Sequence, residues 1–212
     1  MKGRIHWFLD NGHGAINPAT QKPVTPGKRG PEFPKGHDFE GKVLIEGVRN
    51  RAVVDHLSKM LQKEGFKFTN LVDTWKDTPL RDRTNKANAI ARDSDFACVY
   101  LSIHHDAFGK GEFNSANGCG AFAFSKTSRS FPLAEIFSDT IPAATGLKKR
   151  GTKTANFWVL GKTSCLAVLT ENGFMTNLKD ASFAMTDAGS RKIAKGHFDA
   201  IKKIEENFEK YF

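Results

Sequence analysis

Residues 4–14 read RIHWFLDNGHG, and this stretch decides the fold. The apolar run over residues 4–9 is typical of a buried β-strand. The run ends in DNGHG at residues 10–14, whose glycines predict a tight turn. Ligands of an open α/β sheet bind beyond the carboxyl ends of its strands, so His13 is the first candidate for a functional residue.

Two later apolar stretches end in the same way. Residues 97–103 are typical of a fully buried strand that leads into His104, and residues 166–170 lead into Glu171. The carboxyl ends of parallel strands lie at one edge of a sheet. We therefore expect the side chains of His13, His104 and Glu171 to meet at that edge.

Segments with helical periodicity separate these strands. Residues 42–64 form one amphipathic segment, and residues 80–92 form another, for which Thr78 is the expected N-cap and Pro79 the first helical residue. Further strands are expected at 66–72 and 119–124, and further helices near 130–144 and from about residue 187. The alternation predicts an α/β fold, in which one domain over residues 1–212 contains a mixed, largely parallel sheet flanked by helices on both faces.

A proline-rich and glycine-rich stretch at about residues 15–41 predicts a long loop without regular structure. It separates His13 from Glu46, so we expect it to line the groove around the site. Glu46 lies near the start of the first predicted helix and shares a helix face with the apolar Val53 and Leu57. Its side chain should therefore point towards the sheet.

The composition narrows the class of partner. Thirty-two Lys and Arg against 23 Asp and Glu give a formal net charge of +9, which favours a polyanion such as nucleic acid, anionic lipid or cell wall. The three cysteines lack CxxC spacing, so we expect buried free thiols. No signal peptide or transmembrane segment is visible, and we expect export by another route, release on lysis, or a leader absent from this chain.

Two histidines and one carboxylate form a common catalytic zinc site, which leaves a fourth position open. A second carboxylate is then free to act as a base. Each residue taken alone has a simpler explanation, because a histidine after a strand is usually a hydrogen-bonded structural group and a glutamate in a first helical turn favours the helix dipole. Their joint placement at one sheet edge indicates a functional site.

Six motifs, in order along nearly the whole chain, resemble those of the zinc-dependent N-acetylmuramoyl-L-alanine amidase family. They are DNGHG at 10–14, the helix that opens with Glu46, LxxRxxxAN at 80–88, SIHxD at 102–106, RG at 150–151 and ENGFMTN at 171–177. The chain departs from the family pattern in its long 15–41 loop, in Cys165 where proline is usual, and in having no cell-wall-binding repeat.

The resemblance implies that His13, Glu46 and His104 hold one Zn²⁺ per chain and that Glu171 is the catalytic carboxylate. The implied reaction is hydrolysis of the amide bond between N-acetylmuramic acid and the L-alanine of the peptide stem in bacterial peptidoglycan, as in an endolysin or autolysin. Peptidoglycan is then the expected partner, and nucleic acid is not. We expect a monomer that acts on the cell wall and has no separate cell-wall-binding domain.

Two other functions stay open at this stage. Another zinc peptidase or carboxypeptidase acting on the stem peptide would use the same residue types, and only the order of the motifs argues against it. A non-catalytic basic protein that binds cell wall or nucleic acid would need no zinc. The presence of all four candidate residues weighs against that second alternative.

The remaining histidines are expected to be structural or on the surface: His6, His37, His56, His105 and His197. His105 alternates with His104 along its strand, so it should face the opposite side of the sheet. Arg83 and Asn88 are expected to tie a helix to neighbouring loops. Residues 148–150 are expected to form a solvated basic turn.

Overall fold

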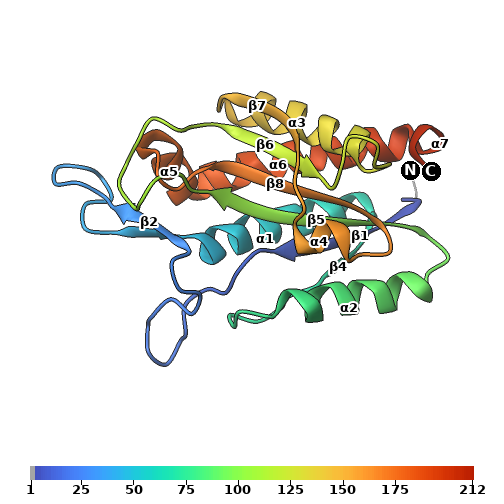
Figure 1. The fold of residues 1–212 in the computed structure, drawn as a ribbon, viewed down its shortest axis with the longest axis horizontal. Helices are drawn as coiled ribbons and strands as arrows, with labels where there is room; N and C mark the ends of the chain where they lie inside the picture. Colours follow the sequence, from blue (N-terminus) through green and yellow to red (C-terminus); the bar gives the residue numbers. More distant parts are fainter. Residues whose placement is uncertain (1–2) are drawn as a thin grey trace.

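A six-stranded sheet runs through the centre of the structure, a computed structural model that describes residues 3–212 (Figure 1). The order across the sheet is β4-β1-β5-β8-β6-β7. The first four strands in this order run parallel, and β6 and β7 run the opposite way. The predicted mixed, largely parallel sheet is confirmed. Its strands are β1 (Ile5–Asn11), β4 (Lys67–Asn70), β5 (Ala97–Asp106), β6 (Cys119–Ala123), β7 (Lys149–Thr154) and β8 (Leu166–Phe174).

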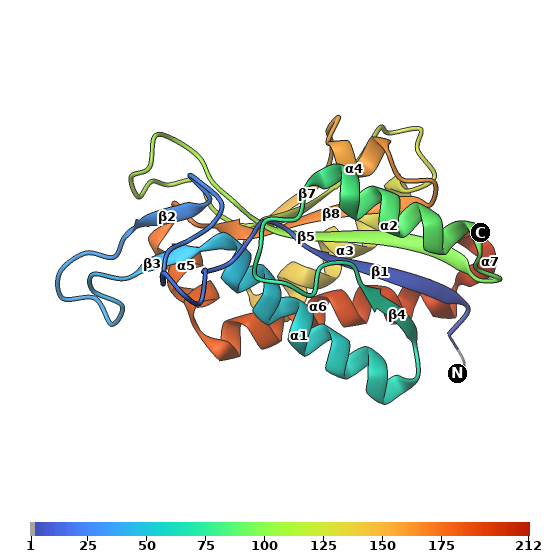
Figure 2. The same cartoon turned by 90° about the horizontal axis from the view of Figure 1, so that it is seen from below.

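Helices cover both faces of the sheet, as the sequence predicts (Figure 2). The central strands are buried on both sides, so Trp7 and Leu101 pack into one apolar cluster while Phe8 and Tyr100 pack into another. The first cluster lies under α1 (Glu46–Glu64), α3 (Phe131–Thr145) and α6 (Asp187–Glu206), and the second under α2 (Leu80–Arg92) and α4 (Trp158–Gly161). The shorter helices α5 (Leu178–Met185) and α7 (Phe208–Tyr211) follow β8 and α6 in the chain.

The two strands that carry candidate residues are longer than their apolar pattern indicates. β5 continues through His104 and His105, and β8 continues through Glu171. Polar side chains at the end of a strand interrupt the apolar run, which hides the true strand end from the sequence. His104 and Glu171 are register partners on neighbouring parallel strands, so both side chains leave the sheet on the α2 and α4 face.

The expectation that residues 15–41 lack regular structure is wrong for residues 29–32. A short strand, β2 (Arg29–Glu32), pairs antiparallel with β3 (Val43–Ile45), and α1 begins only at Glu46, later than predicted. The two strands are too short to show an apolar alternation. Phe33, which follows β2, and Leu44, in the middle of β3, pack in one cluster with Met175, so tertiary contacts stabilise this pair.

Two further local predictions are wrong. α2 begins at Leu80, and the preceding Pro79 has an extended ψ of 144° and provides no side-chain cap. The carbonyl of Thr78 instead accepts a hydrogen bond from the Arg83 side chain. The basic stretch at 148–150 is not a solvated turn, because it runs into strand β7.

The three cysteines are free, as predicted, but only Cys119 is fully buried, while Cys98 and Cys165 are partly exposed. Within residues 3–212, no helix combines the length and the apolar composition that a membrane crossing requires.

Candidate metal centre

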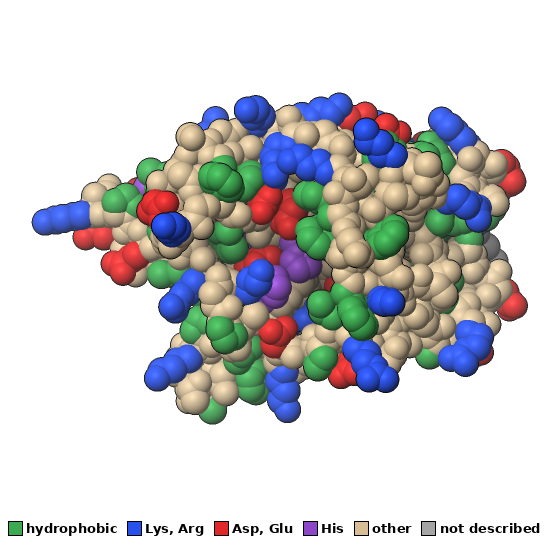
Figure 3. All heavy atoms as spheres, viewed as in Figure 1, with side chains coloured by type: hydrophobic (Ala, Val, Ile, Leu, Met, Phe, Trp, Pro, Cys, Tyr) green, Lys and Arg blue, Asp and Glu red, His purple; other side chains and the backbone are tan. Residues whose placement is uncertain are grey.

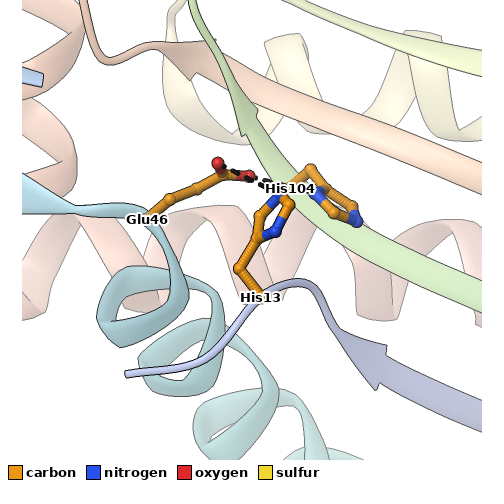
Figure 4. Close-up of side chains that lie close together, drawn as sticks. All are labelled: His13, Glu46 and His104. Atoms are coloured by element: carbon orange, nitrogen blue, oxygen red, sulfur yellow. Dashed lines mark hydrogen bonds and ion pairs between the residues drawn. The ribbon is translucent and has the colours of Figure 1, made fainter. Parts of the chain in front are cut away.

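Three side chains from distant parts of the chain converge near the carboxyl ends of β1 and β5 (Figure 4). His13 follows β1, Glu46 begins α1, and His104 lies on β5. Nε2 of His13 is 3.3 Å from one carboxylate oxygen of Glu46, and Nδ1 of His104 is 3.0 Å from the other. One possible ligand atom from each residue lies within 4.8 Å of the other two. The structure thus brings together the three residues that the sequence predicts to share a site.

These separations fit a zinc ion. Two ligand atoms that are each about 2.0–2.1 Å from a tetrahedral zinc are about 3.3 Å apart, close to the separations of both histidines from Glu46. Two imidazoles and one carboxylate leave a fourth tetrahedral position for water or substrate. Calcium and magnesium prefer oxygen ligands alone, so the donor set favours zinc over either of them.

Gly12 allows the two histidines to approach each other. A Cβ atom on Gly12 would lie 2.1 Å from the ring of His104, so a larger residue there would displace that ring. His13 has a φ of 62°, in the left-handed region that non-glycine residues seldom adopt. Such backbone conformations persist at sites where the surrounding structure holds a side chain for function.

A buried chain of hydrogen bonds orients His104. The hydroxyl of Ser102 donates to Asp10 over 2.7 Å, and its oxygen is 3.1 Å from Nε2 of His104. The single hydroxyl proton is used towards Asp10, so the Ser102 oxygen accepts the Nε2 proton of His104. In the neutral imidazole, Nδ1, which faces the cluster, is then the nitrogen that has a lone pair for a metal. Metal-binding histidines are commonly oriented by a second hydrogen bond of this kind.

Arg83 lies at the far end of this series of hydrogen bonds, next to Asp10. Its guanidinium is buried and donates to Asp10 over 2.6 Å and to the carbonyl of Asn11 over 2.9 Å. Burial alone would raise the pKa of Asp10, but the charge of Arg83 and the interactions with His104 and Ser102 lower it overall. The prediction that Arg83 ties α2 to a neighbouring loop is confirmed by its bond to the Thr78 carbonyl, and the same prediction holds for Asn88, which bonds Lys162 and Ser164.

Replacing Arg83 with Leu should lower the free energy of unfolding by about 3–5 kcal/mol, because Asp10 stays buried without its partner. Arg81→Leu, on the exposed side of the same helix, should change it by less than about 0.5 kcal/mol. Because Asp10 has a lowered pKa in the folded state, its stabilisation is present above the unfolded-state pKa of about 4 and is lost as the pH falls. Urea denaturation at several pH values measures both effects, and equal losses in the two variants would contradict them.

The charges of the cluster suit a bound cation. Burial lowers the pKa of His13 to about 4, so its imidazole is neutral at pH 7. Burial alone would raise the pKa of Glu46, but the hydrogen bond and charge of His104 and the charge of His13 lower it to about 2. A neutral imidazole and an ionised carboxylate are the forms in which these side chains bind metal.

Glu171 lies on the strand next to His104, at the same register. Its Oε2 atom is buried and has no hydrogen-bond partner within residues 3–212. Burial, with the negative charges of Asp106 and Glu46, raises the pKa of Glu171 well above its usual value. A carboxyl group tuned upwards in this way can accept and return a proton near neutral pH, and a nearby cation would lower its pKa again.

Arg150 is a further residue whose charge acts on Glu171. Its guanidinium is 2.7 Å from Asp106 and 4.3 Å above the ring of Phe174. The charge of Arg150 lowers the pKa of Glu171 against the larger effect of burial, so the two side chains are close in space. The sequence motif at 150–151 contained this residue, but its pairing with Asp106 depends on the order β5-β8-β6-β7 across the sheet.

A cavity of about 310 Å³ opens beside the two histidines. Figure 3 shows the histidines in a hollow of the surface, with acidic and basic side chains around them. One wall comes from the 15–41 stretch, where Thr25 accepts the backbone N–H of Gly14 and donates to Asp77. Lys28 also lines this cavity, and its carbonyl accepts the backbone N–H of Glu46. Sequence reasoning expected a loop in the groove but identified neither residue, since neither belongs to a local motif.

The other histidines lie outside this cluster, as predicted. His6 contacts Thr69, His37 contacts Ser182, His56 contacts Asp187 and His197 contacts Thr170. His105 is buried on the opposite face of the sheet from His104, with Nδ1 2.8 Å from the side-chain oxygen of Asn50. Its backbone N–H donates to Glu46 over 3.3 Å.

Replacing His105 with Ala should leave the zinc content at wild-type level, because only its backbone contacts the cluster. The free energy of unfolding should fall by about 1–3 kcal/mol, since the buried Asn50 oxygen loses its partner. Metal analysis of the purified variant, with His104→Ala as the comparison, tests this. If His105→Ala lost stoichiometric zinc and His104→Ala kept it, His105 rather than His104 would be the zinc ligand.

Known proteins are similar to this chain in sequence and in fold. A family model described as N-acetylmuramoyl-L-alanine amidase matches residues 8–203. The sporulation-specific N-acetylmuramoyl-L-alanine amidase of Bacillus subtilis (strain 168) is 34% identical over 202 residues, which cover 92% of this chain and 66% of that protein. N-acetylmuramoyl-L-alanine amidase CwlM of Bacillus licheniformis is 36% identical over 149 residues, which cover 69% of this chain and 55% of that protein. The matched region therefore spans between about half and two thirds of these curated relatives.

A solved structure of N-acetylmuramoyl-L-alanine amidase from Clostridium difficile 630 superposes with a TM-score of 0.74. The alignment covers 97% of this chain and 98% of that one at 21% sequence identity, so it shows a shared fold. The family model covers most of the chain and contains all four candidate residues. This chain belongs to the N-acetylmuramoyl-L-alanine amidase family.

Proposed function

We propose that this chain hydrolyses the amide bond between N-acetylmuramic acid and the L-alanine of the peptide stem in bacterial peptidoglycan, and that it acts at the cell wall. The observation that carries the proposal is the convergence of His13, Glu46 and His104 at zinc-ligand separations, with Glu171 at the same register on the next strand. Family membership supplies the reaction class.

In this proposal His13, Glu46 and His104 hold one zinc ion per chain. Zinc, when bound, lowers the pKa of a water molecule to about 7 and polarises a carbonyl group. Ser102 and Asp10 keep the Nδ1 lone pair of His104 directed at the cluster. The site is thereby preorganised before substrate arrives.

Glu171 is the proposed general base and then the general acid. It takes a proton from the attacking water and returns a proton to the nitrogen of L-alanine as the amide bond breaks. Its partly buried position, with one unpartnered oxygen, keeps it free of competing hydrogen bonds for this transfer. Arg150 and Asp106 form an ion pair whose two charges act on the pKa of Glu171 in opposite directions.

Mass analysis of digested cell wall tests the reaction directly. An amidase releases intact stem peptides that begin with L-alanine and leaves unsubstituted lactyl groups on the glycan. A carboxypeptidase would shorten the stems and leave them attached to sugar, and a binding protein would release nothing. Metal analysis of the same preparation should find one zinc per chain.

The net charge of +9 predicts a second property of the proposed reaction. Binding to intact anionic cell wall should weaken steeply as salt rises from about 0.05 to 0.5 M, because screening shortens the range of surface charges. Hydrolysis of a small soluble muropeptide should change little over the same range. Sedimentation with purified wall measures the first quantity and product release the second. Equal salt sensitivity of both would place the charge effect inside the active site.

A further inference from the structure

We propose that an exposed apolar strip beside α4 binds the glycan strand of the substrate. The strip consists of Leu80, Phe124, Phe157 and Trp158, whose side chains are 40–50% exposed. The inference rests on the proposed function, because it assigns a place to the sugar chain that carries the scissile amide.

The aromatic members of the strip gather around the short helix α4. The ring of Phe124 lies against Gly161 at the end of that helix, where an added Cβ would be 2.9 Å from the ring. Phe157 immediately precedes the helix, and its ring centroid is 5.5 Å from that of Phe122. Trp158 is the first residue of α4. Packing thus holds these rings in place although much of their surface faces solvent.

The strip is continuous with the catalytic cavity. Nε1 of Trp158 donates to the hydroxyl of Thr84 on α2 over 3.3 Å. Leu80 lies one helical turn before Thr84, whose hydroxyl also contacts the Leu80 carbonyl. Leu80 in turn lines the cavity that contains His13 and His104. A ligand held at the histidines can therefore extend over Leu80 onto Trp158.

The two sides of the cavity differ in chemistry. Thr25, Lys28 and Asp77 form a polar wall, whereas Pro79 and Leu80 form an apolar one that leads to the strip. The carbonyl that is attacked belongs to a lactyl group on a sugar, so a sugar must lie within a few bonds of the metal. Pyranose rings have apolar C–H faces and hydroxyl groups at their edges. Exposed aromatic rings fit the faces, and the Lys162 ammonium, 5.7 Å from the centroid of the Trp158 ring, lies near enough to bond hydroxyl groups at the edges.

An apolar surface of this kind usually marks an interaction site. A lipid surface or a second copy of this chain would also cover it, but neither requires contact with the catalytic cavity. Continuity with that cavity favours the glycan. Figure 3 shows hydrophobic side chains on the surface next to the hollow that contains the histidines.

The test measures binding of glycan strands from which the stem peptides have been removed, by calorimetry, with the full chain loaded with zinc. Wild-type protein should bind, and Phe157→Ala/Trp158→Ala should raise the Kd by about tenfold or more, because two partly buried rings lose their contacts. Trp158→Phe should stay within about twofold of wild type, since it keeps a ring on the surface. On intact wall the double substitution should raise KM more than it lowers kcat.

Phe96→Ala is the matched control. Phe96 is 37% exposed and lies at the start of β5, at the opposite end of the sheet from the metal centre. Its removal should leave glycan binding and wall hydrolysis unchanged. Circular dichroism and zinc content of all variants should match wild type.

Equal glycan binding by wild type and the double variant would overturn the proposal. It would also be overturned if the same substitutions abolished binding to lipid vesicles or broke a concentration-dependent dimer without altering glycan binding. Stem release by wild-type protein tests the proposed function separately, because the glycan used for binding has no amide bond to cleave.

Discussion

Replacing Glu171 with Gln is expected to lower stem release by about 10²- to 10⁴-fold while zinc stays bound. Glutamine keeps the size of the side chain and one carbonyl oxygen, but it cannot take up a proton from the attacking water. Glu171 contributes no ligand atom to the His13, Glu46 and His104 cluster, so the metal should be unaffected.

The measurement is muropeptide release and zinc content on one preparation. Glu112→Gln, in the exposed loop after β5, removes the same charge elsewhere and should keep full activity. Near-normal turnover by the Glu171→Gln protein with full zinc would exclude Glu171 as the general base. Loss of zinc in that variant would instead show that Glu171 is a ligand.

Variants that lack a metal ligand should lose activity for a different reason, because they lose zinc. His104→Ala and Glu46→Gln are each expected to lower zinc affinity by more than about 100-fold and to abolish activity, because they remove a direct donor. Ser102→Ala should have a smaller effect of about 10- to 100-fold on zinc affinity, since Ser102 only orients His104.

Competition with a fluorescent zinc chelator ranks these affinities without any activity assay. Exhaustive chelation of wild-type protein should abolish stem release, and added zinc should restore it. Stem release by demetallated protein would rule out the zinc mechanism. An order in which Ser102→Ala lost more zinc than His104→Ala would mean that the cluster binds metal through other atoms.

Local sequence determined much of the framework. Apolar runs of five to seven residues identified the central strands, polar residues directly after two of them identified His104 and Glu171, and the turn after the first identified His13. Helical spacing correctly predicted that the Glu46 side chain points inwards, and Glu46 is only 2% exposed. These features follow from side-chain periodicity, which each segment carries by itself.

Strand order was decided only in the tertiary structure. β1, β5 and β8 are neighbours although about 90 and 60 residues of chain separate them, and this adjacency puts Glu171 next to His104. The apolar pattern of a buried strand is the same whichever neighbour it pairs with. The link from Arg83 through Asp10 and Ser102 to His104 depends on the same adjacency.

The surroundings of the metal centre also depend on long-range contacts. Strand β2 forms only because β3 pairs with it, and that pairing puts the Lys28 carbonyl against the first turn of α1. Trp158 bonds Thr84, which is 74 residues earlier in the chain and one helical turn after the cavity residue Leu80. Thus the sequence by itself determined which residues could perform the chemistry, because strand ends and helix faces are local properties. Tertiary structure decided what surrounds them, because those contacts join segments whose local patterns carry no information about each other.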